Sequence, residues 1–239
     1  MFAAVLAMMG CFFCIGALLT AWQNRHAEPA AKKRRWQKYG FYLLTVNLCL
    51  FSIQWNVSPI FFGIILVIGC WELIYAGGKG SEMRGFQIRL LLLYALLAFC
   101  FLQFGRQVAS ERQLWLYGLI FSFDGFSQLA GQLLGGRKLI PKISPQKTWS
   151  GLLLGTLMAL AAGYFLKGFL SSSRPVDSII PLLLCVTAFC GDALASWVKR
   201  RFQIKDYSQL IPQHGGVLDR FDSLIFSGAL YWILNLGNH

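Results

Sequence analysis

The sequence contains few charged residues for its length. Only 13% of its 239 residues are Asp, Glu, Lys or Arg, whereas soluble domains contain about a quarter. Hydrophobic residues make up 56% of the chain, and the mean hydropathy is +0.54. Apolar runs of about 20 residues, the length that crosses a bilayer, recur along the whole sequence. This composition excludes an ordinary soluble protein and leaves no room for a second soluble domain. It predicts an all-α polytopic membrane protein.

Cysteine gives no indication of a metal site or a disulfide. All seven cysteines fall inside apolar runs, and the Cys11-x-x-Cys14 pair has no second pair of ligands, so packed thiols are expected. The net charge of +12 comes without a soluble basic face, which excludes nucleic acid as an expected partner. The basic loop 25–38 either attracts anionic headgroups, at about 1 kcal/mol per residue, or only sets the topology, the interpretation we favour.

About eight membrane spans are predicted from the apolar runs. The run at 2–22 has no basic residue before it and no clear cleavage site, so we interpret it as a retained span rather than a signal peptide. The predicted spans are 2–22, 39–56, 58–76, 88–104, 113–134, 150–170, 178–198 and 222–237. Most of the Lys and Arg residues fall in four alternate stretches, 23–38, 77–89, 135–149 and 199–221. The positive-inside rule places these stretches in the cytoplasm and both termini outside.

The segment 196–222 has the highest density of reactive side chains. Asp219 and Asp222 are three residues apart, a spacing that puts both on one face of a helix, about 5–6 Å apart at Cβ. They are therefore candidates for holding a hard cation against a phosphate chain. Gly215 and Gly216 lack a Cβ, which permits close approach of the backbone to a ligand. Four cations are suited to neutralising phosphate oxygens: Lys199, Arg200, Lys205 and Arg220. The alternative is a solvated basic loop beside the membrane.

A second segment, 124–149, carries further polar chemistry. Asp124 lies inside a predicted span, as does Asp192 further along, and an ionisable residue in a span is a functional hypothesis by default. Each could instead be the structural partner of a buried Lys or Arg. The run 141–148 contains two prolines, which exclude regular helix, and irregular backbone beside a span is tolerated where it lines a wet cavity. Its Ser144, Lys147 and Thr148 offer donors of the kind that a nucleoside triphosphate needs.

Together the two segments resemble the phosphatidate cytidylyltransferase family, also called CDP-diacylglycerol synthases. The shared pattern is Ser-x-x-Lys-Arg, Lys-Asp and Pro-x-His-Gly-Gly-x-x-Asp-Arg-x-Asp over 196–222, preceded by an intramembrane Asp and Pro-x-Ile-Ser-Pro-x-Lys-Thr. The resemblance covers roughly 120–230, whereas 1–110 reads as generic membrane helix. We therefore divide one membrane unit into N-terminal helices, 1–110, and a C-terminal catalytic region, 111–239. The chain departs from the family pattern at Gln128, Ser150 and Ala195, the last two replacing glutamates.

The resemblance implies an enzyme of phospholipid biosynthesis that transfers a cytidylyl group from CTP to phosphatidate, giving CDP-diacylglycerol and pyrophosphate. It implies Mg²⁺, held by Asp219, Asp222 and Asp192, as cofactor, and the bilayer as environment; a homodimer is left open. The implied catalytic residues are Asp219, Asp222, Lys199, Arg200 and His214; the implied substrate-binding residues are Asp124, Ser144, Lys147, Thr148, Ser196, Lys205, Asp206, Gly215, Gly216 and Arg220. His214 is either a proton or hydrogen-bond partner of phosphate or a residue that orders the loop. We expect a bacterial inner-membrane protein whose polar cavity faces the cytoplasm. The two motif segments should converge there, with 141–148 on one wall, 199–222 on the other, and Asp124 and Asp192 below.

Three alternatives remain open at this point. One is a cytidylyltransferase for a different lipid phosphate, and another is a CTP-dependent lipid kinase. The third is a degenerate homologue that acts as a scaffold or transporter without catalysis. The two missing glutamates favour the third alternative, whereas the intact Asp219-Arg220-Phe221-Asp222 run opposes it. A CDP-alcohol phosphotransferase is disfavoured, because its Asp-Gly-x-x-Ala-Arg run with two further spaced aspartates is absent from the sequence.

Overall fold

The computed structural model describes residues 1–25, 27–77, 81–172, 175–211 and 215–236. Within these residues the chain is almost entirely helical, as predicted, apart from one short antiparallel hairpin. The elements are α1 (Phe2–Gln23), α2 (Pro29–Gln54), α3 (Ser58–Ala76), α4 (Ser81–Gln107), α5 (Ser110–Leu133), β1 (Lys138–Ile140), β2 (Ser144–Thr148), α6 (Trp149–Lys167), the 3-10 helix η1 (Pro175–Ser178), α7 (Ile180–Arg201) and α8 (Leu218–Leu234).

Each predicted span overlaps one of the eight long helices of the described chain. Five of these helices, α1, α3, α4, α6 and α7, are long and apolar enough to cross a membrane. Helices α2 and α5 contain more polar residues, and α8 has only 17 residues with Asp219 in its first turn. The fold is therefore that of a helical membrane protein, and the count of eight spans stays a prediction.

Helices α5 and α6 pack closely because glycines line their interface. A Cβ at Gly151 would lie 2.5 Å from the Ser127 carbonyl oxygen, and one at Gly155 would collide with the Ser127 side chain. Trp115 on α5 donates its indole N–H to the Gly163 carbonyl at 2.8 Å. Small residues that let helix backbones approach are the usual means of packing in membranes. This interface fixes α5, and with it Asp124, against the hairpin that precedes α6.

Helices α3, α4 and α8 share an aromatic core. The Phe62 ring of α3 lies 4.5 Å from that of Phe101 on α4, measured between centroids, and Phe104 packs edge-on against Tyr231 of α8. Phe62, Phe101, Phe104 and Tyr231 are almost completely buried. A buried ion pair joins Arg112 to Asp177 at 3.0 Å at the non-cytoplasmic end predicted by the topology. The aromatic contacts hold α8 against α3 and α4, and the ion pair holds α5 against η1.

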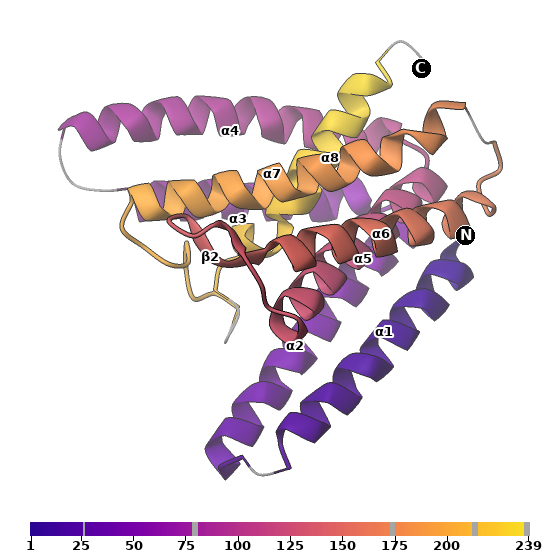
Figure 1. Ribbon diagram of the computed structural model, residues 1–239. Coiled ribbons are helices and arrows are strands. Elements are labelled where there is room, and N and C mark those ends of the chain that lie inside the picture. Colours follow the sequence, from indigo (N-terminus) through magenta and orange to yellow (C-terminus); the bar gives the residue numbers. More distant parts are fainter. Residues whose placement is uncertain (26, 78–80, 173–174, 212–214, 237–239) are drawn as a thin grey trace.

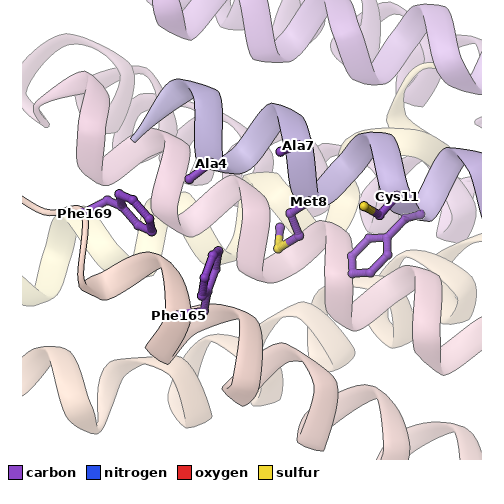
Figure 2. Close-up of a pocket in the computed structure, with 7 residues that line it drawn as sticks. Ala4, Ala7, Met8, Cys11, Phe165 and Phe169 are labelled. Carbon is purple, nitrogen blue, oxygen red and sulfur yellow. The ribbon is translucent and has the colours of Figure 1, made fainter.

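The polar segments gather at one end of the molecule. Figure 1 shows the hairpin and the segment between α7 and α8 together on the left, while the N-terminus and the end of α8 lie toward the right. The connection between α5 and α6 and the connection between α7 and α8 therefore lie at one end. An apolar hollow of about 500 Å³ lies between α1 and α6 (Figure 2). Its lining is Ala4, Ala7, Met8, Cys11, Phe12, Phe165 and Phe169, which carries no charged or hydrogen-bonding side chain apart from a thiol.

Candidate functional site

The proline-containing run 141–148 forms part of the hairpin. It is not helical, as its two prolines predict. Gly135 and Gly136 have positive φ, 60° and 101°, a region that glycine enters without steric cost. The strands then pair antiparallel, with Lys138 opposite Thr148. Thr148 is buried and accepts the Gly151 amide at 3.1 Å, so it caps the start of α6. This predicted substrate-binding residue thus has a structural partner, while Ser144 is only partly buried in β2.

The hairpin contacts α7 through an ion pair. Lys147 Nζ lies 2.8 Å from Asp192 Oδ2 and 4.4 Å from the centre of the Phe189 ring. Asp192 Oδ1 accepts a hydrogen bond from Ser196 at 3.3 Å. One turn further along, Arg200 Nε donates to the Ile143 carbonyl at 3.2 Å. The expected convergence of the two motif segments is confirmed by these contacts.

Asp219 is fully engaged by protein groups. Its Oδ1 accepts Lys199 Nζ at 2.7 Å, and its Oδ2 accepts the backbone N–H groups of Tyr207 at 3.0 Å and Gly216 at 2.9 Å. The side chains of Lys199 and Asp219 are 12% and 2% exposed. A buried pair with this geometry is costly to break. Asp219 therefore fixes Tyr207 and Gly216 against the start of α8.

Tyr207 closes the space beside this ion pair. It is buried, donates its hydroxyl to the Ala195 carbonyl at 3.1 Å, and lies under Lys199, whose Nζ is 5.5 Å from the ring centre. Burial raises the pKa of Tyr207, and the carboxylates of Asp222, Asp219 and Glu72 raise it further. The hydroxyl is consequently a hydrogen-bond donor at neutral pH.

Three other carboxylates approach one another from three helices. Asp222 on α8 is buried and accepts the Ser223 amide at 2.7 Å. The Ser223 hydroxyl lies 3.5 Å from Asp124 on α5. Both Asp222 and Asp124 are close enough to Asp192 on α7 to interact with it electrostatically. Among the described residues no three acidic, His or Cys side chains form a preassembled metal site.

Glu72 is a site residue that the sequence reasoning missed. It lies in α3, is completely buried, and accepts hydrogen bonds from Ser208 and from the amides of Val217 and Leu218. A signal for it was present, because it is the one acidic residue within the run 58–76, and ionisable residues in spans are functional hypotheses. Its partners lie over 130 residues away, which no local spacing indicates.

The two glycines before α8 approach protein carboxylates. A Cβ at Gly216 would lie 2.6 Å from Glu72 Oε1. Gly215 has φ 84°, and a Cβ there would lie 3.0 Å from Asp219 Oδ2 and from Asp206 Cβ. Their lack of a side chain is therefore explained by the packing of the loop itself. His214 falls outside the described residues.

The remaining charged residues predicted for the site lie on the surface. Lys205, Asp206 and Arg220 are exposed, and Arg200 is held by carbonyls of the hairpin and of Ile204. Lys38 at the start of α2 joins this group: partial burial lowers its pKa, and the positive charges of Arg220 and Lys205 lower it further. Like charges gathered in this way favour an anion as ligand.

A cavity of about 750 Å³ adjoins Tyr207. Its walls are the end of α3 and the loop, with Trp71, Tyr75, Ala76 and 204–210 as lining. The cavity predicted between the hairpin and the segment 199–222, which differs from this one, stays a prediction.

The positions that depart from the family pattern have different surroundings. Ser150 donates a hydrogen bond to the Gly135 carbonyl and lies 3.0 Å from the Thr148 hydroxyl, at the base of the hairpin. Ala195 is buried in α7 beneath Tyr207. Gln128 is exposed on α5. Ser150 and Ala195 thus flank the site from opposite segments.

These observations define a class of protein: an integral membrane protein whose apolar helices carry paired lysines and carboxylates near one end. A model of the cytidylyltransferase family matches residues 1–236. The chain belongs to the cytidylyltransferase family. The match includes residues 1–110, to which the sequence motifs gave no specificity.

Three bacterial relatives show the extent of the similarity, and each is a phosphatidate cytidylyltransferase. The protein of Rickettsia typhi is 32% identical over 211 residues, 81% of this chain and 89% of the relative. That of Brucella abortus (strain 9-941) is 34% identical over 175 residues, covering 70% and 63%. That of Rickettsia bellii is 42% identical over 125 residues, covering 49% and 54%. The predicted family resemblance is confirmed.

Proposed function

We propose that the chain transfers the cytidylyl group of CTP to phosphatidate, giving CDP-diacylglycerol and pyrophosphate. The observation that carries this proposal is the family match over residues 1–236, together with relatives that bear this activity in their names. The site geometry supports it, because the hairpin meets α7 at the Lys147–Asp192 pair and at the contact of Arg200 with the Ile143 carbonyl, beside the Lys199–Asp219 pair.

The proposed reaction joins two anions. A phosphate oxygen of phosphatidate attacks the α-phosphorus of CTP, a new P–O bond forms, and the bond to the bridging oxygen breaks with departure of pyrophosphate. Such a reaction requires positioning and charge neutralisation rather than a protein nucleophile. Lys147, Lys199 and Arg220 are suited to this role, since they surround the carboxylates at the end of α7 and the start of α8.

We propose Mg²⁺ as the cofactor, held by Asp222 and Asp192 with Asp124 nearby. Mg²⁺ commonly uses one or two carboxylates, with substrate phosphates and water as its other ligands, and Asp222 and Asp192 would supply this number once Asp192 releases Lys147. Asp219 could bind the ion only if it released Lys199 and two backbone amides. We therefore propose that Asp219 stabilises the loop instead of binding the ion. When bound, the ion would polarise phosphoryl oxygens.

The topology is part of the same proposal. Eight spans place the polar end in the cytoplasm, where the basic stretches 23–38, 77–89, 135–149 and 199–221 are expected. The bacterial inner membrane is the proposed location, and residues 111–239 carry the proposed catalytic groups. A homodimer is compatible with this arrangement.

The test uses purified full-length chain in mixed micelles, with labelled CTP and a panel of lipid phosphates and diacylglycerol. The expected products are CDP-lipid and pyrophosphate. Lipid phosphate with CDP would instead identify a CTP-dependent kinase. Preferential use of another lipid phosphate would identify that lipid as the substrate. Absence of both reactions would favour a non-catalytic homologue.

Replacing Lys38 by methionine is expected to raise the KM for CTP while leaving kcat almost unchanged. Lys38 lies electrostatically close to Lys205 and Arg220, and an interaction made equally in the ground and transition states changes KM alone. An increase of roughly 3–10-fold corresponds to about 0.6–1.4 kcal/mol, which is typical of a partly exposed charge pair. Steady-state kinetics measure it, with exposed Lys33→Met as matched control. Equal KM values in the two variants would exclude Lys38 from the site.

The missing glutamates predict a high Mg²⁺ requirement. If Ser150 and Ala195 border the proposed cation site, restoring carboxylates with Ser150→Glu and Ala195→Glu should lower the Mg²⁺ concentration at half-saturation. Groups around a metal ligand typically change affinity by about 10–100-fold. A Mg²⁺ titration of CDP-lipid formation by the wild type and double variant measures the change. Identical half-saturation would show that neither position affects the cation.

A further inference from the structure

Glu72 is buried without an ion-pair partner in the described part of the chain. Its exposed fraction is 0%, and the ion pairs found among the described residues do not include it. Burial of a carboxylate is costly unless hydrogen bonds satisfy it. Here Oε1 accepts the Ser208 hydroxyl and the Val217 amide (2.9 Å), while Oε2 accepts the Leu218 amide (2.8 Å). All three donors lie in the motif region 196–222.

The three consecutive amides before and at the start of α8 are shared between two carboxylates. Asp219 accepts the Gly216 amide, and Glu72 accepts those of Val217 and Leu218. Amides at a helix start lack partners within the helix and carry partial positive charge. A negative side chain from α3 therefore satisfies the start of the helix that bears Asp219 and Asp222. Glu72 and Asp219 occupy donors that a phosphate would otherwise bind.

The same contact determines where α8 lies relative to α3. Gly216 has no room for a Cβ beside Glu72, and the Phe61 ring of α3 packs edge-on against Phe221 at 6.0 Å. Asp222 follows Phe221 directly, one turn after the residues that Glu72 holds. A shift of Val217 and Leu218 is thus transmitted along α8 to Asp222.

We propose that Glu72 is a positioning residue for the cytidylyl transfer, fixing the first turn of α8 so that Asp222 faces Asp124 and Asp192. This inference rests on the proposed function. It assigns a specific task to the N-terminal helices, since α3 supplies an anionic cap to a helix about 145 residues further along the chain.

The central variant is Glu72→Gln, which keeps the volume but replaces one acceptor oxygen by an NH₂ donor. One of the α8 amides then loses its acceptor, and its hydrogen exchange should accelerate roughly tenfold, as expected for one lost hydrogen bond. We expect kcat to fall roughly 10–100-fold, because a displacement of about 1 Å can cost about 10²-fold. The KM for CTP should change less than kcat.

Two further variants complete the design. Glu111→Gln is the matched control, because partly buried Glu111 accepts the amide and hydroxyl of Ser171 far from the motif region; its kcat should equal that of the wild type. Ser208→Ala removes a single donor to Glu72 and should lower kcat severalfold, in the direction of Glu72→Gln. If Glu72→Gln does not fold, the kcat of Ser208→Ala tests the proposal in its place.

The outcomes separate the two proposals. Unchanged kcat per folded molecule in Glu72→Gln, or in Ser208→Ala where only this variant folds, would overturn the positioning role. Loss of thermal stability with wild-type kcat would also overturn it. Wild-type protein that forms no CDP-lipid would overturn the proposed reaction alone, because exchange at Val217 and Leu218 tests the anchoring of α8 without turnover.

Discussion

Asp222→Asn is expected to abolish CDP-lipid formation while the protein stays folded. The substitution removes a negative charge at nearly constant volume from a buried position where one oxygen accepts the Ser223 amide, and the asparagine carbonyl can keep that bond. The proposed cation loses a ligand, so we expect turnover to fall about 10³-fold or more, equivalent to about 4 kcal/mol of transition-state stabilisation. Turnover in mixed micelles and the Tm of the same preparation measure the two effects.

Glu28→Gln serves as the charge-neutralising control for this variant, because Glu28 is exposed and precedes α2. It should retain wild-type turnover. Full activity in Asp222→Asn would show that the cluster formed with Asp124 and Asp192 is not the reaction site.

Asp219→Ala is expected to act mainly on stability. It leaves Lys199 largely buried without its partner and removes the acceptor of the Tyr207 and Gly216 amides. Loss of one member of a buried ion pair costs about 3–5 kcal/mol, so the free energy of unfolding should fall by about that amount. Denaturant unfolding in detergent measures the change.

The double variant Asp219→Ala with Lys199→Met tests the cause of that loss. It no longer leaves a buried charge without a partner, so it should be more stable than Asp219→Ala alone. A single variant with wild-type stability would show that the ion pair contributes nothing to the fold. The two aspartates of one motif are thereby separated into one expected to support turnover and one expected to support structure.

Local patterns were sufficient to predict the helices and the break between them. Apolar runs located each long helix, although α2 begins ten residues and α4 seven residues before the predicted span, and Pro141 and Pro145 excluded helix where the hairpin lies. The complementary charges of the two motif segments predicted that they would converge, and Arg200 contacts the hairpin while Lys147 pairs with Asp192. The helices and the break depend on composition and spacing along a single segment, and the convergence depends on charge.

The hydrogen-bond and ion-pair partners of the functional groups could not be predicted in the same way. The spacing of Asp219 and Asp222 indicates a common helix face, but it does not show that Lys199 and two amides fill the coordination of Asp219. The lack of a Cβ at Gly216 indicated close approach of a ligand, whereas the group that approaches Gly216 is the Glu72 carboxylate. Each of these facts depends on a contact between helices distant in sequence.

The Lys147–Asp192 ion pair has a consequence for substrate entry. In its resting form the hairpin and α7 already hold one positive and one negative charge in contact. Arrival of a magnesium–triphosphate would then be an exchange of partners, in which the ion takes the carboxylate and the phosphate takes the ammonium. Few new charges need to be desolvated during such an exchange, since each protein charge gives up one counterion for another. The hairpin would keep its contact with α7 through Arg200 and the Ile143 carbonyl, so that only the Lys147 side chain needs to move when nucleotide enters.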